Sequence, residues 1–446
     1  MLTNMSQSNQ PAKRKRGILL SAKGWQRLQS AEMRLSQQDN AGKPYTLQDL
    51  SDRTGLSSNT LARVRGRKVP VDHQTLDCYF RAFELVLNPD DYTDSESTIT
   101  AQRPLLPPNG QLAVDSPFYI ARSPAEGLCY EAILQPGGLV RLKAPRQMGK
   151  TSLVARTLMQ ARENQFATVM LNLRLADASI FRDLSRFLQW FCAVVTRDLE
   201  LPNRLGECWD DLFGASYNCT HYFETYLLPA LDRPLVLALD EIDAVFEYPE
   251  VASDFFGILR AWYEKARYGD DRSELWQKLR LILIHSTEVY VPLSIAQSPF
   301  NAGLMVDLPG LTESQVQDLA QRYHLANAAD VARQVLKLVG ANTHLAHLAI
   351  YYLSTERVSL EQLTLSALAP DGIYSSYLRQ QLSELQQYPE LLAAFRQVVL
   401  SETPISLEPI LAFKLQSKGL IQVQSHRIVP SCELYQQYFS QVFQSL

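Results

Sequence analysis

The stretch Leu142-Lys-Ala-Pro-Arg-Gln-Met-Gly-Lys-Thr-Ser-Leu153 decides the fold. It comes directly after a short apolar run, Gly138–Leu142, and it leads into a helical stretch, Ser152–Arg162. A strand, a loop ending in Gly-Lys-Thr and a helix are the parts of a phosphate-binding loop, in which main-chain N–H groups and a helix N-terminus face an anion. The pattern therefore predicts a site for ATP with Mg²⁺, lined by Arg146, Gln147, Met148, Gly149, Lys150, Thr151 and Ser152.

Two side chains of this loop have roles that follow from their chemistry. Lys150 can reach the β- and γ-phosphates and act on them during catalysis, and the hydroxyl of Thr151 can hold Mg²⁺. The usual GxxxxGK[ST] pattern has Gly where this chain has Ala144. Because Ala adds only a methyl group, we expect the loop to form.

A second pattern supplies carboxylates. The apolar run Leu235–Leu239 ends in Asp240-Glu241. An Asp at the end of a buried strand can hold the metal, usually through water, and the adjacent Glu can orient or deprotonate the attacking water. Asp240 is thus a predicted metal residue and Glu241 a predicted catalytic residue, whereas Asp243 can simply cap the next helix.

A third pattern follows the run Leu281–Ile284. A polar residue at the end of this strand would lie level with the γ-phosphate, so Ser286 and Thr287 are catalytic candidates, with capping of the strand end as the alternative. Four arginines are candidates for stabilising charge during hydrolysis, although most surface arginines are merely solvated: Arg260, Arg267, Arg272 and Arg280.

The strand runs, which include Ala167–Leu173, are apolar throughout, as central strands of a parallel sheet are. Helical stretches such as Ser179–Leu199 supply the crossovers, so the fold class is α/β, doubly wound, with a P-loop core. Helical spacing recurs at Thr312–Tyr323, Ala328–Val339 and His344–Leu353, and alternation around Ser425 predicts a hairpin and a C-terminal winged helix. The predicted organisation is a disordered basic tail (1–16), a helix-turn-helix domain (17–90), a linker (91–113), the P-loop core (114–310), a helical lid (311–366) and a winged-helix-like domain (367–446).

The N-terminal region has the helix-capping and turn residues of a helix-turn-helix. A first helix is expected over Leu19–Gln38. Next, Thr46 can cap a helix with Leu47 and Leu50 inward, Gly55 ends it, and Ser57 or Ser58 caps a second helix with Leu61 and Val64 inward. A further helix is expected from Asp72 to Phe83. The second helix and its end carry the predicted DNA-binding residues Asn59, Arg63, Arg65, Arg67 and Lys68.

Charge supports a nucleic-acid partner for this region alone. Residues 1–84 hold fourteen Lys/Arg against seven Asp/Glu, whereas the whole chain has a net charge of -4. The alternative is a protein-interaction bundle with a basic rim. Residues 367–446 hold five Lys/Arg against six Asp/Glu, which favours docking or autoinhibition over phosphate binding.

Composition narrows the remaining possibilities. Hydrophobic residues make up 46% of the 446 residues, which excludes a largely disordered chain. The six cysteines form no CxxC pair, and no apolar run approaches the ~18 residues of a membrane span, so we expect a cytoplasmic protein without membrane contact.

Several motifs together resemble the AAA-like ATPase family that is common in cyanobacteria and close to STAND and origin-recognition-type ATPases. They are Ser116-Pro-Phe-Tyr-Ile-Ala-Arg122, the phosphate loop, the Leu-Ala-Leu-Asp-Glu-Ile-Asp run, His-Ser-Thr-Glu-Val-Tyr and Ser298-Pro-Phe-Asn301. The resemblance covers about residues 114–440 and implies that Tyr119 and Ile120 lie beside adenine. The first 90 residues resemble the helix-turn-helix module of vWA-MoxR-associated proteins.

The expected function is a regulatory ATPase whose nucleotide state controls engagement of DNA, a protein partner or a second copy of the chain. Two alternatives stay open. One is an ATP-binding transcription regulator with little hydrolysis, and the other is an initiator-like ATPase that remodels DNA.

Overall fold

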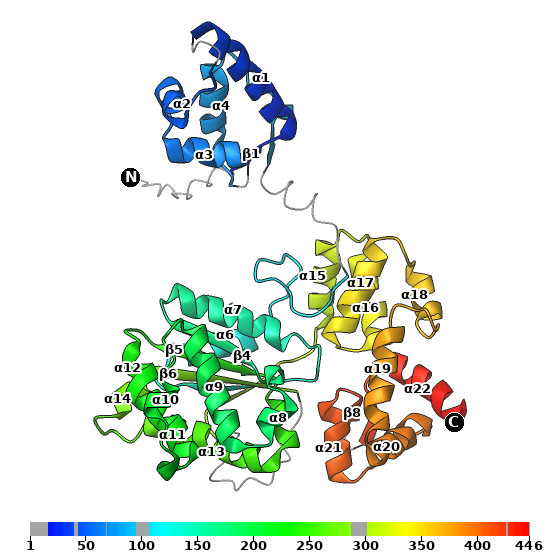
Figure 1. Cartoon of the computed structure of the whole chain (residues 1–446). Coiled ribbons are helices and arrows are strands. Elements are labelled where there is room, and N and C mark those ends of the chain that lie inside the picture. Colours follow the sequence, from blue (N-terminus) through cyan, green and yellow to red (C-terminus); the bar gives the residue numbers. More distant parts are fainter. Residues whose placement is uncertain are drawn as a thin grey trace, which may run out of the picture. The chain divides into compact units, whose positions relative to one another are not determined.

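The computed structural model describes residues 17–39, 43–67, 69–94, 107–286, 301–424 and 427–445. The chain divides into an N-terminal unit, residues 1–106, and a second unit, residues 107–446 (Figure 1). Each unit has its own hydrophobic core. The basic tail expected over residues 1–16 lies outside the described residues.

The N-terminal unit is a small helical bundle with a two-stranded sheet. The capping predictions are confirmed for the middle helices: Thr46 forms a capping box with Asp49, Gly55 ends the first of them at φ 71°, and Ser57 caps the second. The elements are β1 (Ile18–Leu20), α1 (Ala22–Asp39), α2 (Leu47–Thr54), α3 (Ser58–Gly66), α4 (His73–Ala82), η1 (Pro89–Asp91) and β2 (Tyr92–Asp94).

Two expectations for this unit are wrong. The first helix does not begin at Leu19, because Ile18–Leu20 forms β1, which pairs antiparallel with β2. Leu47 does not face inward: 43% of it is exposed, since it occupies the first helical position and Leu50 fills the core-facing side of α2. The pairing of β1 with β2 also brings Tyr92–Asp94, expected in the linker, into this unit.

The second unit is built on a parallel sheet, as the sequence predicts, and this sheet has five strands. Its order is β4-β5-β6-β3-β7, so that β6 separates the strand before the phosphate loop from the strand that ends in Asp240. The strands are β3 (Leu139–Lys143), β4 (Ala167–Asn172), β5 (Leu235–Asp240), β6 (Leu279–His285) and β7 (Leu304–Asp307). Every residue of β5 and β6 is buried, which explains their uninterrupted apolar sequences.

Helices cover both faces of this sheet. One face packs on α6 (Ala125–Leu134) and α7 (Lys150–Glu163), and the other on α9 (Leu184–Asp198), α11 (Ala215–Tyr222) and α13 (Pro249–Lys265). The helical stretch expected over Ser179–Leu199 is interrupted, since Asp183 caps a new helix there. The shorter elements are η2 (Leu173–Leu175), α8 (Ala178–Phe181), α10 (Leu205–Cys208), η3 (Asp211–Phe213), a π-helical turn η4 (Phe223–Leu227), α12 (Leu228–Ala230), η5 (Ile242–Glu247) and α14 (Ser273–Trp276).

The rest of the unit is helical apart from one hairpin. The expected lid helices and the hairpin are present, and β8 pairs antiparallel with β9. The elements are α15 (Glu313–Arg322), α16 (Ala328–Val339), α17 (Thr343–Ser354), α18 (Leu360–Ser366), α19 (Ser375–Gln386), α20 (Pro389–Leu400), α21 (Pro409–Ser417), β8 (Ile421–Gln424), β9 (Arg427–Pro430) and α22 (Glu433–Ser445).

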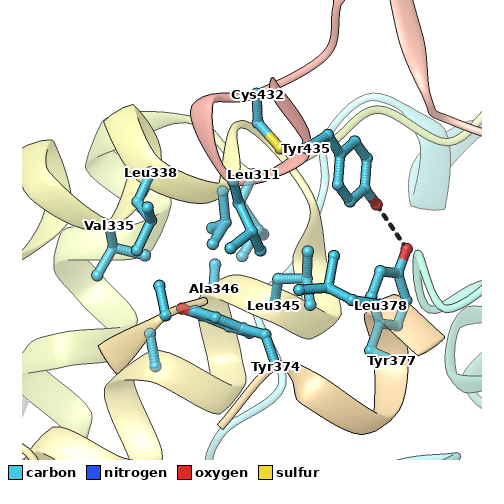
Figure 2. Packing of buried hydrophobic residues seen from close by; sticks show 14 of the residues in the cluster. Leu311, Val335, Leu338, Leu345, Ala346, Tyr374, Tyr377, Leu378, Cys432 and Tyr435 are labelled. Carbon is cyan, nitrogen blue, oxygen red and sulfur yellow. Dashed lines mark hydrogen bonds between the residues drawn. The ribbon is translucent and has the colours of Figure 1, made fainter. Parts of the chain in front are cut away.

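These C-terminal elements share one hydrophobic core. Figure 2 shows Tyr374 lying beneath lid residues such as Ala346, and the hydroxyls of Tyr377 and Tyr435 joined by a hydrogen bond of 2.7 Å. The boundary expected between residues 366 and 367 therefore runs through a continuous core. Within the described residues, no helix combines the length and apolarity that crossing a membrane requires.

Candidate functional site

The predicted site residues meet at one edge of the parallel sheet. The phosphate loop follows β3, Asp240 ends β5 and Ser286 follows β6, so their carboxyl ends lie side by side. Gly149 precedes the first residue of α7 at φ 92°, a left-handed conformation that Gly adopts without strain. The N-terminus of this 14-residue helix therefore faces the space beside the loop.

Lys150 is a buried cation whose direct hydrogen-bond partners are neutral oxygens. Its Nζ donates to the carbonyl oxygens of Ala144 at 2.8 Å and Pro145 at 2.9 Å, and to Ser286 Oγ at 3.0 Å. Among the residues that the structure describes, no carboxylate oxygen lies within 4.0 Å of this Nζ. Burial lowers the pKa of Lys150 to about 8. A buried ammonium held by neutral oxygens fits a site that receives an anion.

A hydroxyl and a carboxylate lie together next to this lysine. Thr151 Oγ1 donates to Asp240 Oδ2 at 3.1 Å, and Asp240 Oδ1 accepts from the N–H of Glu241 at 2.9 Å. Asp240 is 5% exposed, and burial raises the pKa of its carboxyl group. Hydroxyl and carboxylate oxygens are the ligands that Mg²⁺ prefers, so this pair fits the predicted metal residues.

Glu241 lies at the same edge but is already paired. Its backbone has a φ of 54°, and its Oε2 lies 2.9 Å from Nε of Arg174 in η2. The sequence analysis did not single out Arg174. Asp243 accepts from the N–H of Ser286 at 2.8 Å, so it joins η5 to the end of β6. Thr287 lies outside the described residues.

The loop lines a cavity of about 400 Å³. Both predicted adenine residues, Tyr119 and Ile120, line it, but the ring of Tyr119 is covered by the guanidinium of Arg156 at 3.4 Å. Ile120 is thus the better placed apolar contact. Lining residues that the sequence analysis did not predict include Leu112, Phe118, Arg122, Leu311, Leu319, Thr343, His344 and His347.

Arg122 is the most buried of these unpredicted polar residues, at 2% exposure. Its Nη1 donates to the carbonyl oxygen of Met148 and, at 3.2 Å, to Thr343 Oγ1 at the start of α17. Its Nε is buried without a hydrogen-bond partner among the described residues, and burial lowers its pKa. Arg122 therefore joins the phosphate loop to the lid and keeps one donor unused beside the cavity.

The other loop residues divide into two groups. Arg146, Gln147 and Ser152 line the cavity, although Arg146 also pairs with Glu384 of α19 at 2.8 Å. Met148 does not present its side chain to the cavity, because that side chain is buried in the core beneath α6 and α7. It contributes its backbone alone to the loop.

A scan against protein-family models matches residues 107–441 to the AAA-like domain. The chain belongs to this AAA-like family. A curated relative, an uncharacterized WD repeat-containing protein of Synechocystis sp., is 25% identical over 250 residues, which are 53% of this chain and 20% of that protein. The chain therefore corresponds to a small part of that relative.

Solved structures with a similar fold include a Walker-type ATPase of Pyrococcus abyssi, with 13% identity, a TM-score of 0.48, and coverage of 72% of this chain and 96% of that one. Cdc6p of Pyrobaculum aerophilum has 14% identity, a TM-score of 0.36, and coverage of 74% and 97%. A STAND protein of Pyrococcus horikoshii has 14% identity, a TM-score of 0.31, and coverage of 77% and 44%. The family assignment rests on the domain match.

The four candidate arginines of the AAA-like domain do not line the cavity. Arg280 is 5% exposed and donates to carbonyl oxygens, including that of Ile133, so it is structural. Arg260 pairs with Glu264, Arg267 lies over the ring of Tyr263, and Arg272 pairs with Glu224.

The predicted DNA-binding residues do not share one environment. Asn59, Arg63 and Arg67 are exposed on or just after α3. Arg65 is turned inward: its Nη1 contacts Glu32 at 3.0 Å and Tyr79 at 2.9 Å, and its guanidinium covers Trp25. Arg65 is therefore less available to DNA than Arg63 and Arg67, because this side chain holds α3 against α1 and α4. Lys68 lies outside the described residues.

Proposed function

We propose that the chain is an ATP-binding regulatory ATPase whose nucleotide state controls engagement of DNA or a protein partner. The observation that carries the proposal is Lys150, a buried ammonium bound by neutral oxygens at the N-terminus of α7. Arg122 adds a buried Nε that has no hydrogen-bond partner among the described residues. The residues fit ATP with Mg²⁺, which Thr151 and Asp240 would hold; bound Mg²⁺ offsets phosphate charge.

The remaining roles follow from position. Lys150 contacts the phosphates, and Glu241 orients or deprotonates the attacking water. Ser286, already 3.0 Å from Lys150 Nζ, is placed to respond when that lysine changes partners. Ile120 supplies the apolar contact expected beside adenine. Thr287, which follows Ser286 in the sequence, remains a catalytic candidate.

Substituting Glu241 separates binding from hydrolysis. Glu241→Gln should keep ATP affinity and slow turnover by about 10²–10⁴-fold, because water activation alone is lost. Glu250→Gln, an exposed acid in the first turn of α13, is the matched control. Steady-state phosphate release and ATP titration measure the two quantities, and unchanged turnover in Glu241→Gln would remove Glu241 from the catalytic role.

One observation is consistent with slowed hydrolysis and therefore with the alternative of an ATP-binding transcription regulator. The ion pair between Arg174 and Glu241 occupies the carboxylate that would act on water. Full ATP binding together with negligible phosphate release from the unsubstituted chain would select this alternative.

We assign DNA engagement to the N-terminal unit as a helix-turn-helix, with α3 as the recognition helix. Its support is the excess of Lys/Arg over residues 1–84 and the exposure of Asn59, Arg63 and Arg67. Lys68, next in sequence, remains in the proposed contact set. Binding should weaken steeply with salt, with each neutralised phosphate contributing about -0.9 to the log–log slope.

We interpret α19–α22 with the β8–β9 hairpin as a winged-helix-like element. Its nearly balanced charge suits a protein partner or a second copy of the chain better than a duplex. An initiator-like motor would require an arginine supplied by a neighbouring copy. The mass of the complex with ATP, with ADP and with neither tests this: a single mass in all three states would exclude nucleotide-controlled assembly.

A further inference from the structure

One wall of the cavity beside the phosphate loop comes from a segment that was expected in the linker. Residues 107–113, which the sequence analysis placed in the linker, belong to the second unit, and Pro108, Asn109, Gly110, Gln111 and Leu112 line the cavity. This segment is the point at which the chain leaves the AAA-like domain toward the N-terminal unit. Unlike the phosphate loop, this wall carries no charged side chain and no phosphate-binding motif.

Two anchors hold this segment on α7. The N–H of Leu112 donates to Ser152 Oγ at 3.0 Å, and Arg156 Nη2 donates to the carbonyl oxygen of Ala113 at 2.8 Å. Arg156 Nη1 also donates to the carbonyl oxygen of Ser152 at 2.9 Å, and both anchoring residues are less than 8% exposed. Because Ser152 and Arg156 are one turn apart, the segment is fixed to the first turns of the helix that faces the phosphates.

The segment also carries groups suited to a purine base. Leu112 is half-buried at the cavity, on an apolar surface that includes Phe118 and Ile120. Asn109 and Gln111 are exposed, and within the described residues neither side-chain amide makes a hydrogen bond. An amide offers a donor and an acceptor together, the combination that pairs with the edge of adenine.

We infer that residues 109–112 form the base-binding wall of the nucleotide site, so that an adenine nucleotide fixes the root of the linker to the N-terminal unit. Leu112 packs on the base, and the amide of Gln111 or Asn109 reads its edge. Nucleotide state then reaches the N-terminal unit through the chain itself. This inference rests on the proposed ATP site and adds a specificity element and a route of coupling.

Hydrogen exchange of the full chain, with and without ATP and Mg²⁺, tests the coupling. We expect nucleotide to protect peptides covering both residues 144–152 and residues 107–113. Protection of residues 144–152 alone would overturn the inference and leave the nucleotide site standing. Protection of neither segment would overturn the nucleotide site and the inference with it.

Substitutions test the wall independently. Leu112→Ala should weaken ATP binding by about tenfold, because the base loses an apolar contact. Gln111→Ala and Asn109→Ala together should reduce the preference for ATP over GTP. Val114→Ala is the control, since Val114 is exposed directly after this segment and does not line the cavity. Equal ATP affinity and unchanged base preference in all these variants would overturn the assignment.

Discussion

Glu241 illustrates how one neighbour can control a catalytic candidate. Its carboxylate lies at the edge of the cavity, but Arg174 holds it through a contact of 2.9 Å between half-exposed side chains. Exposed ion pairs contribute up to about 1 kcal/mol, so releasing Glu241 should be inexpensive. The ion pair should therefore slow the proposed use of Glu241 as a base only modestly and should not prevent it.

Arg174→Ala should accelerate ATP turnover by up to about fivefold, because about 1 kcal/mol of ion pairing no longer opposes the use of Glu241 as a base. Arg197→Ala, an exposed arginine at the end of α9, is the control. Phosphate release under saturating ATP measures the effect. Slower turnover in Arg174→Ala would mean that Arg174 positions Glu241 or contacts the nucleotide.

The positions of the candidate site residues were predictable where the deciding pattern is local. Lys150, Thr151 and Asp240 could be found because each has a fixed place beside a strand. Arg122 was visible only as part of a motif, since its contact with Met148 spans 26 positions. The inward pairing of Arg65 was missed for the same reason: its partner Glu32 is 33 positions away, and no helix pattern shows such a pair.

At the scale of elements, the lid helix α17 carries a buried histidine that the sequence did not reveal. His347 lies at the cavity, and its Nε2 is 2.8 Å from the hydroxyl of Tyr323 on the adjoining helix segment. Burial, with a contribution from His344, lowers the pKa of His347 to about 4. The folded lid therefore holds this imidazole neutral at pH values where an unfolded chain would protonate it.

Lid stability should fall as the pH drops from about 6.5 toward 4, because over that window the unfolded state binds a proton that the folded state does not. The loss attributable to His347 should be at most about 3 kcal/mol. His347→Gln keeps a hydrogen-bonding group toward Tyr323 and should flatten this part of the profile. Hydrogen exchange in α15–α17 measures it, and identical pH profiles for the two proteins would contradict the assignment.

Two arginines of α3, the helix that we propose as the recognition helix, can be tested separately. Arg65→Ala should destabilise the N-terminal unit by about 1–3 kcal/mol, since it removes the cation paired with the carboxylate of Glu32, although the hydroxyl of Tyr79 still donates to Glu32. Arg63→Ala should preserve stability and weaken DNA binding; a base contact would cost about 1–3 kcal/mol on the preferred site, whereas a phosphate contact would weaken all sequences alike. Thermal unfolding and DNA titration of the full chain check both. Undiminished DNA affinity in Arg63→Ala would favour the protein-interaction bundle.

Strands and helices were predicted correctly where the hydrophobic pattern of the sequence matches the burial of the element. The strands β5 and β6 are wholly buried and read as plain apolar runs. The strand β7 was missed because it has four residues and lies at the sheet edge with Met305 52% exposed. Similarly, Ile18–Leu20 fits a helical pattern in sequence, and only its pairing with a strand more than seventy residues later makes it β1.

At the scale of the whole molecule, the second unit links its parts through the phosphate loop. Arg146 reaches Glu384 of α19, Arg122 reaches Thr343 of α17, and Ser152 holds Leu112 of the linker. The lid and the C-terminal elements share one core. A ligand in the cavity would thus lie beside contacts that lead to α17, to α19 and to the segment of residues 107–113.

The most direct test of this account is the titration of the full chain and of Lys150→Ala with ATP and Mg²⁺ by calorimetry. Lys337→Ala, an exposed lysine on α16, is the matched control. The account predicts binding by the unsubstituted chain and by the control, with a loss of about a hundredfold or more in Lys150→Ala, because the buried ammonium is the main charge facing the phosphates. Equal affinity in all three proteins would contradict it.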